Sequence, residues 1–379
     1  MATRVLWLIK GLGPGGAERL LVNAAAVHHH DRFHIECGYV VPEKRHLVGD
    51  LEAVGVRCHC LSSSARDVLW PWRLRQLIAA GKFDVVHFHS PLVAAMGRLA
   101  TLTIRRASRP ARITTEHNSW ATYSAPTRWL NRLTSALDTR TFAVSSEAAA
   151  SMRGRARSRA TVLRHGIDVD GTAGRTSERT AARSELGLHA DHFVVGTVAN
   201  YREQKDYPTL LEAARQISHE VPAFRLVAVG QGPLAAEVEA TRTGLGLGES
   251  VILTGYRADA IRVMTAFDVF TLSSRYEGLP VALMEALALG LPVASTAVGG
   301  VAETLTDEVD ALLVPPGDPT ALAAAWRRIC DDAPLRARLC EGSRAQAAQF
   351  DIRRTVAVLE EAYDDAVDAI PGRRDSGRP

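Results

Sequence analysis

The sequence alternates short apolar runs with helix-like periodicity from end to end, and this alternation limits what the chain can fold into. Strands that alternate with helices form parallel sheets covered by helices on both faces. We therefore predict an α/β protein with two doubly wound sheets, one in each half of the chain. The expected strands are Val5–Ile9, His34–Val41, Val56–Leu61, Val85–Phe88, Ile113–Glu116, Thr141–Val144 and Thr161–Arg164 in the first half, then Phe193–Val198, Phe224–Val229, Val251–Leu253, Val269–Leu272, Pro292–Ser295 and Ala311–Val314.

The two halves are predicted to be separate domains. At 379 residues the chain exceeds the size at which one hydrophobic core stops growing. A stretch rich in Gly, Thr, Ser and Arg, Gly171–Thr180, separates the halves and is typical of a linker. We expect a first domain over residues 1–168, a linker over 169–180, a second domain over 181–352, a final helix over 353–370 and a disordered tail over 371–379.

Composition narrows the class of protein. No apolar run approaches the ~20 residues that cross a bilayer, and the apolar N-terminus passes directly into a Gly-rich loop, so we predict a first strand there and a cytoplasmic protein. The five cysteines are scattered without any C-x-x-C pair, which argues against a disulfide framework and against a structural zinc site. With a net charge of only +3, no nucleic-acid partner is expected.

The segment Tyr276–Ala286 carries the chemistry that the sequence shows most clearly. It follows a predicted strand, and Pro280 suits the first position of a helix. A strand, loop and helix in this order direct unpaired amides and the positive end of a helix dipole at a ligand, which favours a diphosphate. Glu277 in the loop and Glu285 on the helix can accept hydrogen bonds from hydroxyl groups. We interpret the segment as a sugar-nucleotide site.

Lys205 is the second candidate. The chain has 41 arginines and four lysines, and Lys205 is the only lysine in the second half. A compact ammonium and a planar guanidinium are not interchangeable. Lys205 follows a predicted strand, where its charge could bind a phosphate.

The spacing of Glu277 and Glu285, eight residues apart in this context, resembles the signature of the retaining glycosyltransferases of the GT-B fold, family 4. The resemblance implies two Rossmann-like domains that face each other across a cleft, the first binding an acceptor and the second a nucleotide sugar. It implies transfer with retention at the anomeric carbon and without a metal or other cofactor. It also implies that the final helix crosses back to the first domain.

The resemblance also implies site residues. His117 is expected near the transferred sugar, and family members usually carry Gly-Arg five residues before the lysine, where this chain has Ala199 and Asn200, so Arg202 is expected to replace that arginine. The family's hinge motif usually has Asn where this chain has His165. The catalytic candidates are His117, Lys205 and Glu277; the donor-binding candidates add Gly15, Gly16, Asn200, Arg202, Gly230, Tyr256, Arg257, Gly278, Leu279, Val281 and Glu285; the acceptor-side candidates are His87 and His89.

The expected reaction moves a sugar from a nucleotide sugar, UDP-sugar first, to a hydroxyl of a polysaccharide, glycolipid or metabolite. A sugar-nucleotide 2-epimerase, a glycan phosphorylase and a non-catalytic sugar-binding protein on the same scaffold stay open as alternatives. A second hypothesis places arginines of the first domain against an anionic membrane, each being worth about 1 kcal/mol near such a surface. These arginines are Arg98, Arg105, Arg106, Arg109, Arg112, Arg153, Arg155, Arg157 and Arg159.

Overall fold

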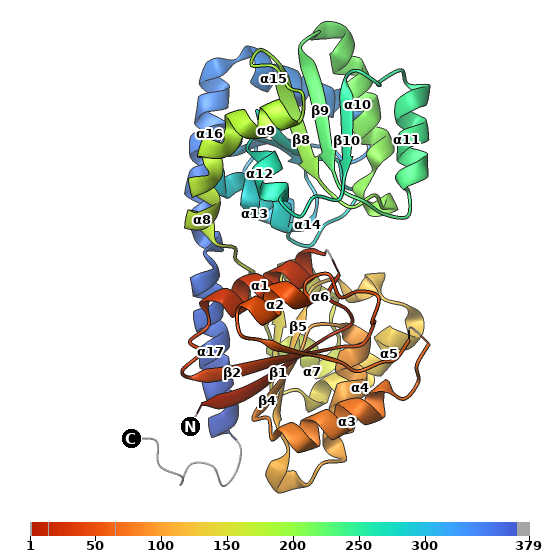
Figure 1. Ribbon diagram of the computed structural model, residues 1–379, viewed down its shortest axis with the longest axis vertical. Coiled ribbons are helices and arrows are strands. Elements are labelled where there is room, and N and C mark those ends of the chain that lie inside the picture. Colours follow the sequence, from red (N-terminus) through yellow and green to blue (C-terminus); the bar gives the residue numbers. More distant parts are fainter. Residues whose placement is uncertain (1, 14, 65, 370–379) are drawn as a thin grey trace. The chain divides into compact units, whose positions relative to one another are not determined.

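The computed structural model describes residues 2–13, 15–64 and 66–369, so the predicted tail over 371–379 lies outside the described residues. The chain divides into two compact units (Figure 1). Unit 1 contains the residues up to Ile167 together with those from Ile352 onward, and unit 2 spans Asp168–Asp351. Each unit is an α/β structure built on one parallel sheet, which confirms the predicted fold class.

The sheet of unit 1 has seven parallel strands in the order β3-β2-β1-β4-β5-β6-β7. The chain moves outward from β1 to β3, then returns to the other side of β1 with β4, so the topological switch point lies between β1 and β4. In sheets of this kind ligands bind at the carboxyl ends of the strands, at the switch point. The strands are β1 (Thr3–Ile9), β2 (Phe33–Tyr39), β3 (Arg57–Cys60), β4 (Val85–Phe88), β5 (Ala111–Glu116), β6 (Arg140–Ala143) and β7 (Ala160–Val162).

Helices cover both faces of this sheet, and β1 shows how the sequence determines the two layers (Figure 1). Val5, Trp7 and Ile9 pack in one core with α1 and α17, whereas Leu6 and Leu8 pack in another with α3 and α4. Both sets are buried because alternate side chains of a strand point to opposite faces. The helices of unit 1 are α1 (Gly16–Val27), α2 (Val48–Ala53), α3 (Trp70–Gly81), α4 (Pro91–Leu102), α5 (Ala125–Thr134), α6 (Ser146–Ser151), α7 (Gly154–Arg159) and α17 (Ile352–Asp368).

The last helix, α17, belongs to unit 1 although it follows the whole of unit 2. The amide of Ile352 donates to the carbonyl of Ile167 at 2.9 Å, where the chain re-enters the unit. The indole of Trp7 on β1 donates to the hydroxyl of Tyr363 at 3.0 Å in the buried interior. The helix is therefore part of the core of unit 1.

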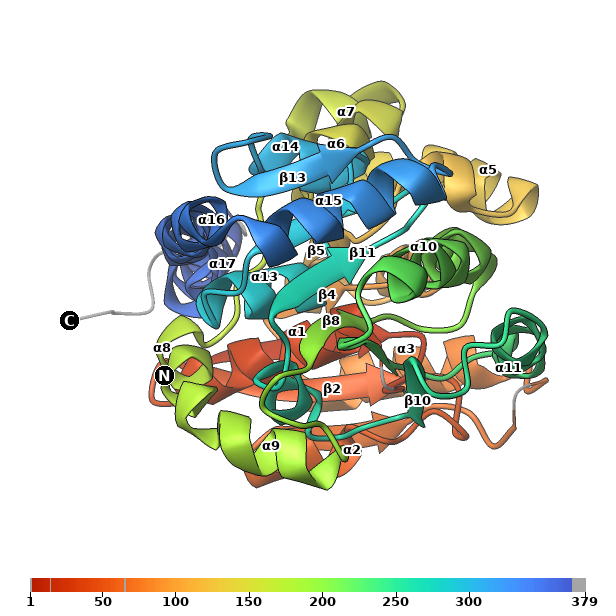
Figure 2. The same cartoon turned by 90° about the horizontal axis from the view of Figure 1, so that it is seen from above.

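The sheet of unit 2 has six parallel strands in the order β10-β9-β8-β11-β12-β13. Its switch point lies between the paired strands β8 and β11, which are labelled in Figure 2. The strands are β8 (Phe193–Val198), β9 (Phe224–Val229), β10 (Val251–Gly255), β11 (Val269–Leu272), β12 (Val293–Thr296) and β13 (Ala311–Val314). The α-helices are α8 (Val169–Ala173), α9 (Arg179–Glu185), α10 (Tyr207–Glu220), α11 (Ala235–Gly244), α12 (Ala260–Met264), α13 (Val281–Ala288), α14 (Gly299–Thr304), α15 (Pro319–Asp331) and α16 (Ala333–Ala347).

The stretch that the sequence predicts as a linker is helical. Asp168 accepts a hydrogen bond from the amide of Gly171 at 3.2 Å and so caps α8. A short 3-10 helix, Gly174–Glu178, leads into α9. Of the helices that the structure describes, none is both long and apolar enough to cross a bilayer.

Candidate functional site

Two loops meet at the switch point of unit 2, one after β8 and one after β11. The amide of Arg275 donates to the carbonyl of Gln204 at 2.9 Å, and the hydroxyl of Ser273 donates to the carbonyl of Lys205 at 2.8 Å. The side-chain amide of Gln204 donates to the carbonyl of Tyr276 at 2.9 Å. These hydrogen bonds join segments about seventy residues apart and fix the loops as one surface at the carboxyl ends of two adjacent strands.

Lys205 and Glu277 are in direct contact on this surface. The ammonium of Lys205 pairs with Oε1 of Glu277, which also accepts from the hydroxyl of Ser274 at 2.5 Å. Oε2 accepts from the side-chain amide of Gln204 at 3.2 Å. Glu277 is only 7% exposed, so its carboxylate is held in one position. The ammonium has three N–H donors, and this contact leaves the others for a phosphate.

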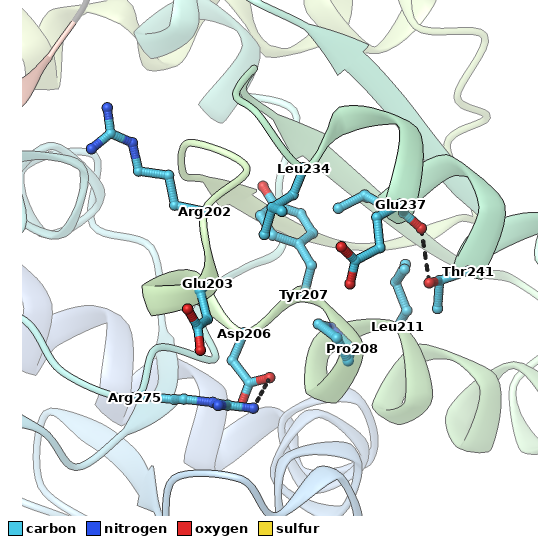
Figure 3. A pocket seen from close by; sticks show the side chains of 11 residues that line it. Arg202, Glu203, Asp206, Tyr207, Pro208, Leu211, Leu234, Glu237, Thr241 and Arg275 are labelled. Carbon is cyan, nitrogen blue, oxygen red and sulfur yellow. Dashed lines mark hydrogen bonds and ion pairs between the residues drawn. The ribbon is translucent and has the colours of Figure 1, made fainter.

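Arg202, whose carbonyl accepts from the amide of Lys205 at 2.9 Å, adds a second positive charge to the same loop. Its guanidinium is exposed and points away from Asp206 and Glu237 (Figure 3). In the part of the chain that the structure describes, Arg202 has no ion pair, whereas nearby Arg275 pairs with the buried Asp206 at 3.1 Å. Arg202 is thus available to an anion and Arg275 is not. Asn200, the other predicted donor residue of this loop, is half-buried next to it.

A cavity of about 150 Å³ lies between the start of α10 and α11, and Arg202 and Arg275 are among the residues that line it (Figure 3). Tyr207, Pro208 and Leu211 of α10 line it, and Glu237 and Val238 of α11 face them. Neither Lys205 nor Glu277 lines this cavity. It is therefore distinct from the surface that carries the lysine and the glutamate.

Glycines allow the neighbouring loops to approach this surface closely. A Cβ on Gly230 would lie 2.0 Å from the carbonyl oxygen of Ala199, so the loop after β9 packs against the loop after β8 only with glycine there. A Cβ on Gly300 would lie 2.0 Å from the carbonyl oxygen of Gly278, which accepts from the amide of Gly300 at 2.7 Å. The second contact orients the loop that carries Glu277.

Helix α13 begins directly after this loop. No side chain caps its first turn, and Pro280 occupies the N-cap position. The predicted donor residues Gly278, Leu279 and Val281 thus lie where the loop turns into the helix, near the positive end of its dipole. Glu285 lies one turn further along α13 and is 8% exposed.

The predicted base-binding turn follows β10. Gly255 has a φ of 70°, a conformation that favours glycine, and the amide of Gly230 donates to its carbonyl at 3.0 Å. Tyr256 is exposed. Arg257 pairs with Asp259 at 2.7 Å and with Glu185 at 2.6 Å, and these hydrogen bonds raise its pKa. Its guanidinium is therefore committed to carboxylates, which leaves the backbone of the turn to contact a ligand.

In unit 1, the loops after β1 and β4 meet at the switch point. The hydroxyl of Ser90 accepts from the amide of Lys10 at 2.9 Å, and the amide of His89 donates to the carbonyl of Leu8 at 2.8 Å. The predicted residues Gly15 and Gly16 lie at the N-cap and first position of α1. The start of α1 carries the positive end of a helix dipole, and the carboxylate of Glu18 lies beside Gly15 there.

His117 lies at the carboxyl end of β5 and contacts two other histidines. Its Nε2 is 3.3 Å from Nδ1 of His89, and its Nδ1 is 3.2 Å from Nε2 of His165. Burial lowers the pKa of His117 to about 4 and lowers the pKa values of His89 and His165 well below the ordinary value. All three rings are therefore neutral near pH 7. The sequence predicted His117 and His89 but treated His165 only as a hinge residue; its departure from the family's usual Asn was the available signal.

His87 does not lie where the sequence places it. It is fully buried, and its Nδ1 and Nε2 are each 2.8 Å from a hydroxyl, that of Tyr363 and that of Thr115. Because the indole of Trp7 donates to Tyr363, the hydroxyl of Tyr363 can donate to His87. Burial lowers the pKa of His87 to about 3. We therefore assign His87 to the core beneath the site and not to an acceptor-binding surface.

The proposed basic surface needs a similar correction. Arg98 is 1% exposed and forms a bidentate pair with Asp138, so it cannot meet a membrane. Arg109 and Arg112 donate to the carbonyls of Leu102 and Leu137, both at 2.7 Å. The other arginines of the predicted set are exposed: Arg105, Arg106, Arg153, Arg155, Arg157 and Arg159.

Comparison with known proteins identifies the family. The model of the family described as Glycosyltransferase Family 4 matches residues 14–170, and that of Glycosyl transferases group 1 matches residues 178–346. The EpsF protein of Bacillus subtilis (strain 168) is 29% identical over 81% of each chain. A second relative, the UDP-Gal:alpha-D-GlcNAc-diphosphoundecaprenol alpha-1,3-galactosyltransferase of Escherichia coli, is 26% identical over 78% of each chain.

The solved structures agree with the sequence relatives. HepE of Anabaena, solved in complex with UDP and glucose, aligns with a TM-score of 0.85 at 22% identity and covers 96% of this chain and 99% of its own. A likeness at this identity shows the fold, which is GT-B. The two family models together span nearly the whole chain, one on each unit. The chain therefore belongs to the group 1, family 4 glycosyltransferases, and it is an enzyme that transfers sugars.

Proposed function

We propose that this enzyme transfers a sugar from a nucleotide sugar, UDP-sugar first, to an acceptor hydroxyl, with retention of configuration. The contact between Lys205 and Glu277 at the switch point of unit 2 carries the proposal. It places an ammonium and an immobilised carboxylate where a doubly wound sheet binds ligands. HepE, solved with UDP and glucose, and the relative from Escherichia coli, which is named for UDP-Gal, support a UDP-sugar as the donor.

The charges on unit 2 suit the leaving group. As the bond between the anomeric carbon and the phosphate oxygen breaks, its electron pair passes to the diphosphate, and negative charge grows there. Fixed positive groups directed at that charge stabilise the transition state more than the ground state. Lys205, the unpaired Arg202 and the amides at the start of α13 supply such groups without a metal or other cofactor.

We propose that retention is achieved without a covalent intermediate on Glu277. Among the described residues, Lys205, Ser274 and Gln204 donate to its two oxygens, which suits a carboxylate that orients its neighbours. We propose that it accepts a hydrogen bond from a sugar hydroxyl and keeps Lys205 in place. The acceptor oxygen then bonds to the anomeric carbon from the face that the diphosphate leaves, and its proton passes to a phosphate oxygen.

Thermal unfolding with a panel of nucleotide sugars tests the donor. A ligand at one hundred times its Kd stabilises the folded state by about 2.7 kcal/mol. We expect stabilisation by UDP-sugars, and less in the Lys205→Met variant. A matched control, Arg257→Met, removes a cation already committed to carboxylates and should keep the stabilisation. Equal stabilisation of wild type and Lys205→Met would remove Lys205 from the donor site.

Release of nucleoside diphosphate separates the remaining alternatives. A glycosyltransferase releases it together with a glycosylated product, a 2-epimerase returns the epimeric nucleotide sugar, and a sugar-binding protein leaves the donor unchanged. A glycan phosphorylase would instead need inorganic phosphate and a cofactor lysine, and Lys205 is the only lysine of unit 2. A glycosylated product is the expected result.

We also propose that the acceptor is part of a polysaccharide or glycolipid at the cytoplasmic face of an anionic membrane, and that α5 helps unit 1 reach it. Trp129 and Leu133 are exposed on α5, and Arg128 and Arg132 lie beside them. Exposed aromatic and aliphatic side chains flanked by arginine are typical of helices that lie in a membrane interface. This surface replaces the arginine set that includes the buried Arg98.

Vesicle sedimentation tests this surface. Binding to vesicles with anionic lipid should weaken in the Trp129→Ser/Leu133→Ser variant and persist in Val309→Ser, which removes an equally exposed apolar side chain from unit 2. The Trp129 fluorescence should shift to shorter wavelength on binding. Equal binding to vesicles with and without anionic lipid, or undiminished binding of the double variant, would contradict the proposal.

A further inference from the structure

Three histidines of unit 1 form a continuous row, although they come from three different loops. His89 follows β4, His117 follows β5, and His165 follows β7 by three residues. The nitrogen-to-nitrogen distances are 3.3 Å between His89 and His117 and 3.2 Å between His117 and His165. The rings of His117 and His165 are nearly parallel, at 5°, with centroids 4.8 Å apart. His117 is therefore held from both sides, through both of its ring nitrogens.

In such a row of neutral imidazoles, the nitrogen that carries the proton on one ring determines which nitrogen carries it on the next. Each neutral ring has one N–H donor and one bare acceptor nitrogen. Both contacts can be hydrogen bonds only if all three rings point their N–H groups in the same direction along the row. His117 then carries its proton on Nδ1, donating to His165, or on Nε2, donating to His89. The tautomer of one ring thus determines the tautomers of the other two.

The surroundings keep this row neutral. His89 is 6% and His165 is 9% exposed. The titratable groups that face the row are histidines, with His87 only 4.1 Å from His89 between ring centroids. Nε2 of His89, at one end of the row, is buried and has no hydrogen-bond partner among the described residues. The row therefore consists of three buried rings, and the nitrogen at its His89 end has no hydrogen-bond partner among the described residues.

We propose that His165 is a positioning residue that fixes the ring plane and the tautomer of His117. His165 acts on His117 and not on substrate. It contacts Nδ1 of His117, and its ring lies parallel to the His117 ring. The consequence for sugar transfer rests on the proposed function and on the expectation, implied by the family resemblance, that His117 lies near the transferred sugar. The geometric part stands on its own, because it concerns only contacts within unit 1.

Histidine NMR tests the geometric part. Protein labelled with ¹³C and ¹⁵N in histidine reports the tautomer and the titration of His117, which the His117→Gln variant assigns. Wild type should show one tautomer that stays neutral well below pH 6. His165→Leu, which fills the volume without a hydrogen bond, should release a mixture of His117 tautomers. His165→Asn, whose amide can donate or accept, should restore one tautomer.

His59 serves as the internal control for folding, since it pairs with Glu36 elsewhere in unit 1 at 2.6 Å. If the His59 signal is unchanged and His117 keeps a single tautomer in His165→Leu, the proposal is overturned. The same holds if His165→Asn behaves as His165→Leu does.

Kinetics then test the functional part separately. His165→Leu should lower kcat at least tenfold with the donor KM changed less than twofold, and His165→Asn should recover part of the loss. Tautomer changes without any change in kcat would leave the positioning role intact and refute the role of His117 in transfer. An unchanged tautomer with a lowered kcat would overturn the positioning role instead.

Discussion

Replacing Arg98 by alanine should destabilise unit 1 more than any surface substitution. Its guanidinium is buried and donates at 2.8 and 2.7 Å to the two oxygens of Asp138, at 2.8 Å to Asn131 and at 2.9 Å to Thr114. Without it the Asp138 carboxylate, which is 4% exposed, is left buried without a cation. Breaking a buried pair by removing one partner costs about 3–5 kcal/mol. For a domain of about 150–250 residues this lowers Tm by roughly 6–20 °C.

Three variants distinguish the uncompensated charge from a simple loss of packing. Arg98→Met keeps most of the volume and should be nearly as unstable as Arg98→Ala, whereas Arg98→Met/Asp138→Asn should recover much of the loss because no charge stays buried. The exposed Arg105→Ala should change stability by less than about 0.5 kcal/mol. Denaturant unfolding followed by circular dichroism provides the free energies. A cost below about 1 kcal/mol for Arg98→Ala, or no recovery in the double variant, would refute this reasoning.

Three further predictions concern the site and the last helix. Lys205→Ala should lower kcat by about 10²–10³ with a smaller change in donor KM, and Lys205→Arg should not restore it fully; initial rates of nucleotide release decide, and an unchanged kcat would leave a surface lysine. Glu277→Ala should abolish transfer and Glu285→Ala should mainly weaken nucleotide binding in titration calorimetry, with near-normal turnover of both arguing against the site. Although burial opposes the ionisation of Glu360, hydrogen bonds from His28 and His29 lower its pKa to about 2. The contribution of Glu360 to the free energy of unfolding is therefore present above its unfolded pKa and is lost as the pH falls toward 2. Unfolding measured as a function of pH should show this loss in wild type, and an equal loss in Glu360→Gln would contradict it.

The strands were predictable from the sequence because both faces of each sheet are covered. A strand buried on both faces is a nearly continuous apolar run, and Val269–Leu272 is predicted and observed with the same bounds. The order of the strands was not predictable, because β1 pairs with β2 and with β4 through contacts distant in the sequence. The helical nature of the stretch after Asp168 was also missed, since its Gly and Ser content favours a loop.

The site was predictable as a set of strand ends but not as a set of contacts. Lys205 and Glu277 were each predicted from their loops, whereas their pairing depends on β8 and β11 being neighbours. The prediction that Arg98 lies on the surface was wrong, because Arg98 is buried. Its partner Asp138 lies 40 residues away in the sequence, and nothing local distinguishes this arginine from the exposed ones.

His165 was missed as a contact of His117 for the same reason. The two residues lie 48 positions apart and meet only after the sheet of unit 1 has formed. The sequence could mark both as histidines near strand ends, and it could mark His165 as unusual for its motif. It could not show that their nitrogens meet.

The most direct test of the account is the rate of UDP release and product formation from a UDP-sugar, measured for wild type, Lys205→Met, Glu277→Gln and Arg257→Met. Wild type and Arg257→Met should form a product whose anomeric configuration, read by ¹H NMR, matches that of the donor. Lys205→Met and Glu277→Gln should lose this activity while remaining folded. Transfer that persists in both of these variants, or a product of inverted configuration, would contradict the account.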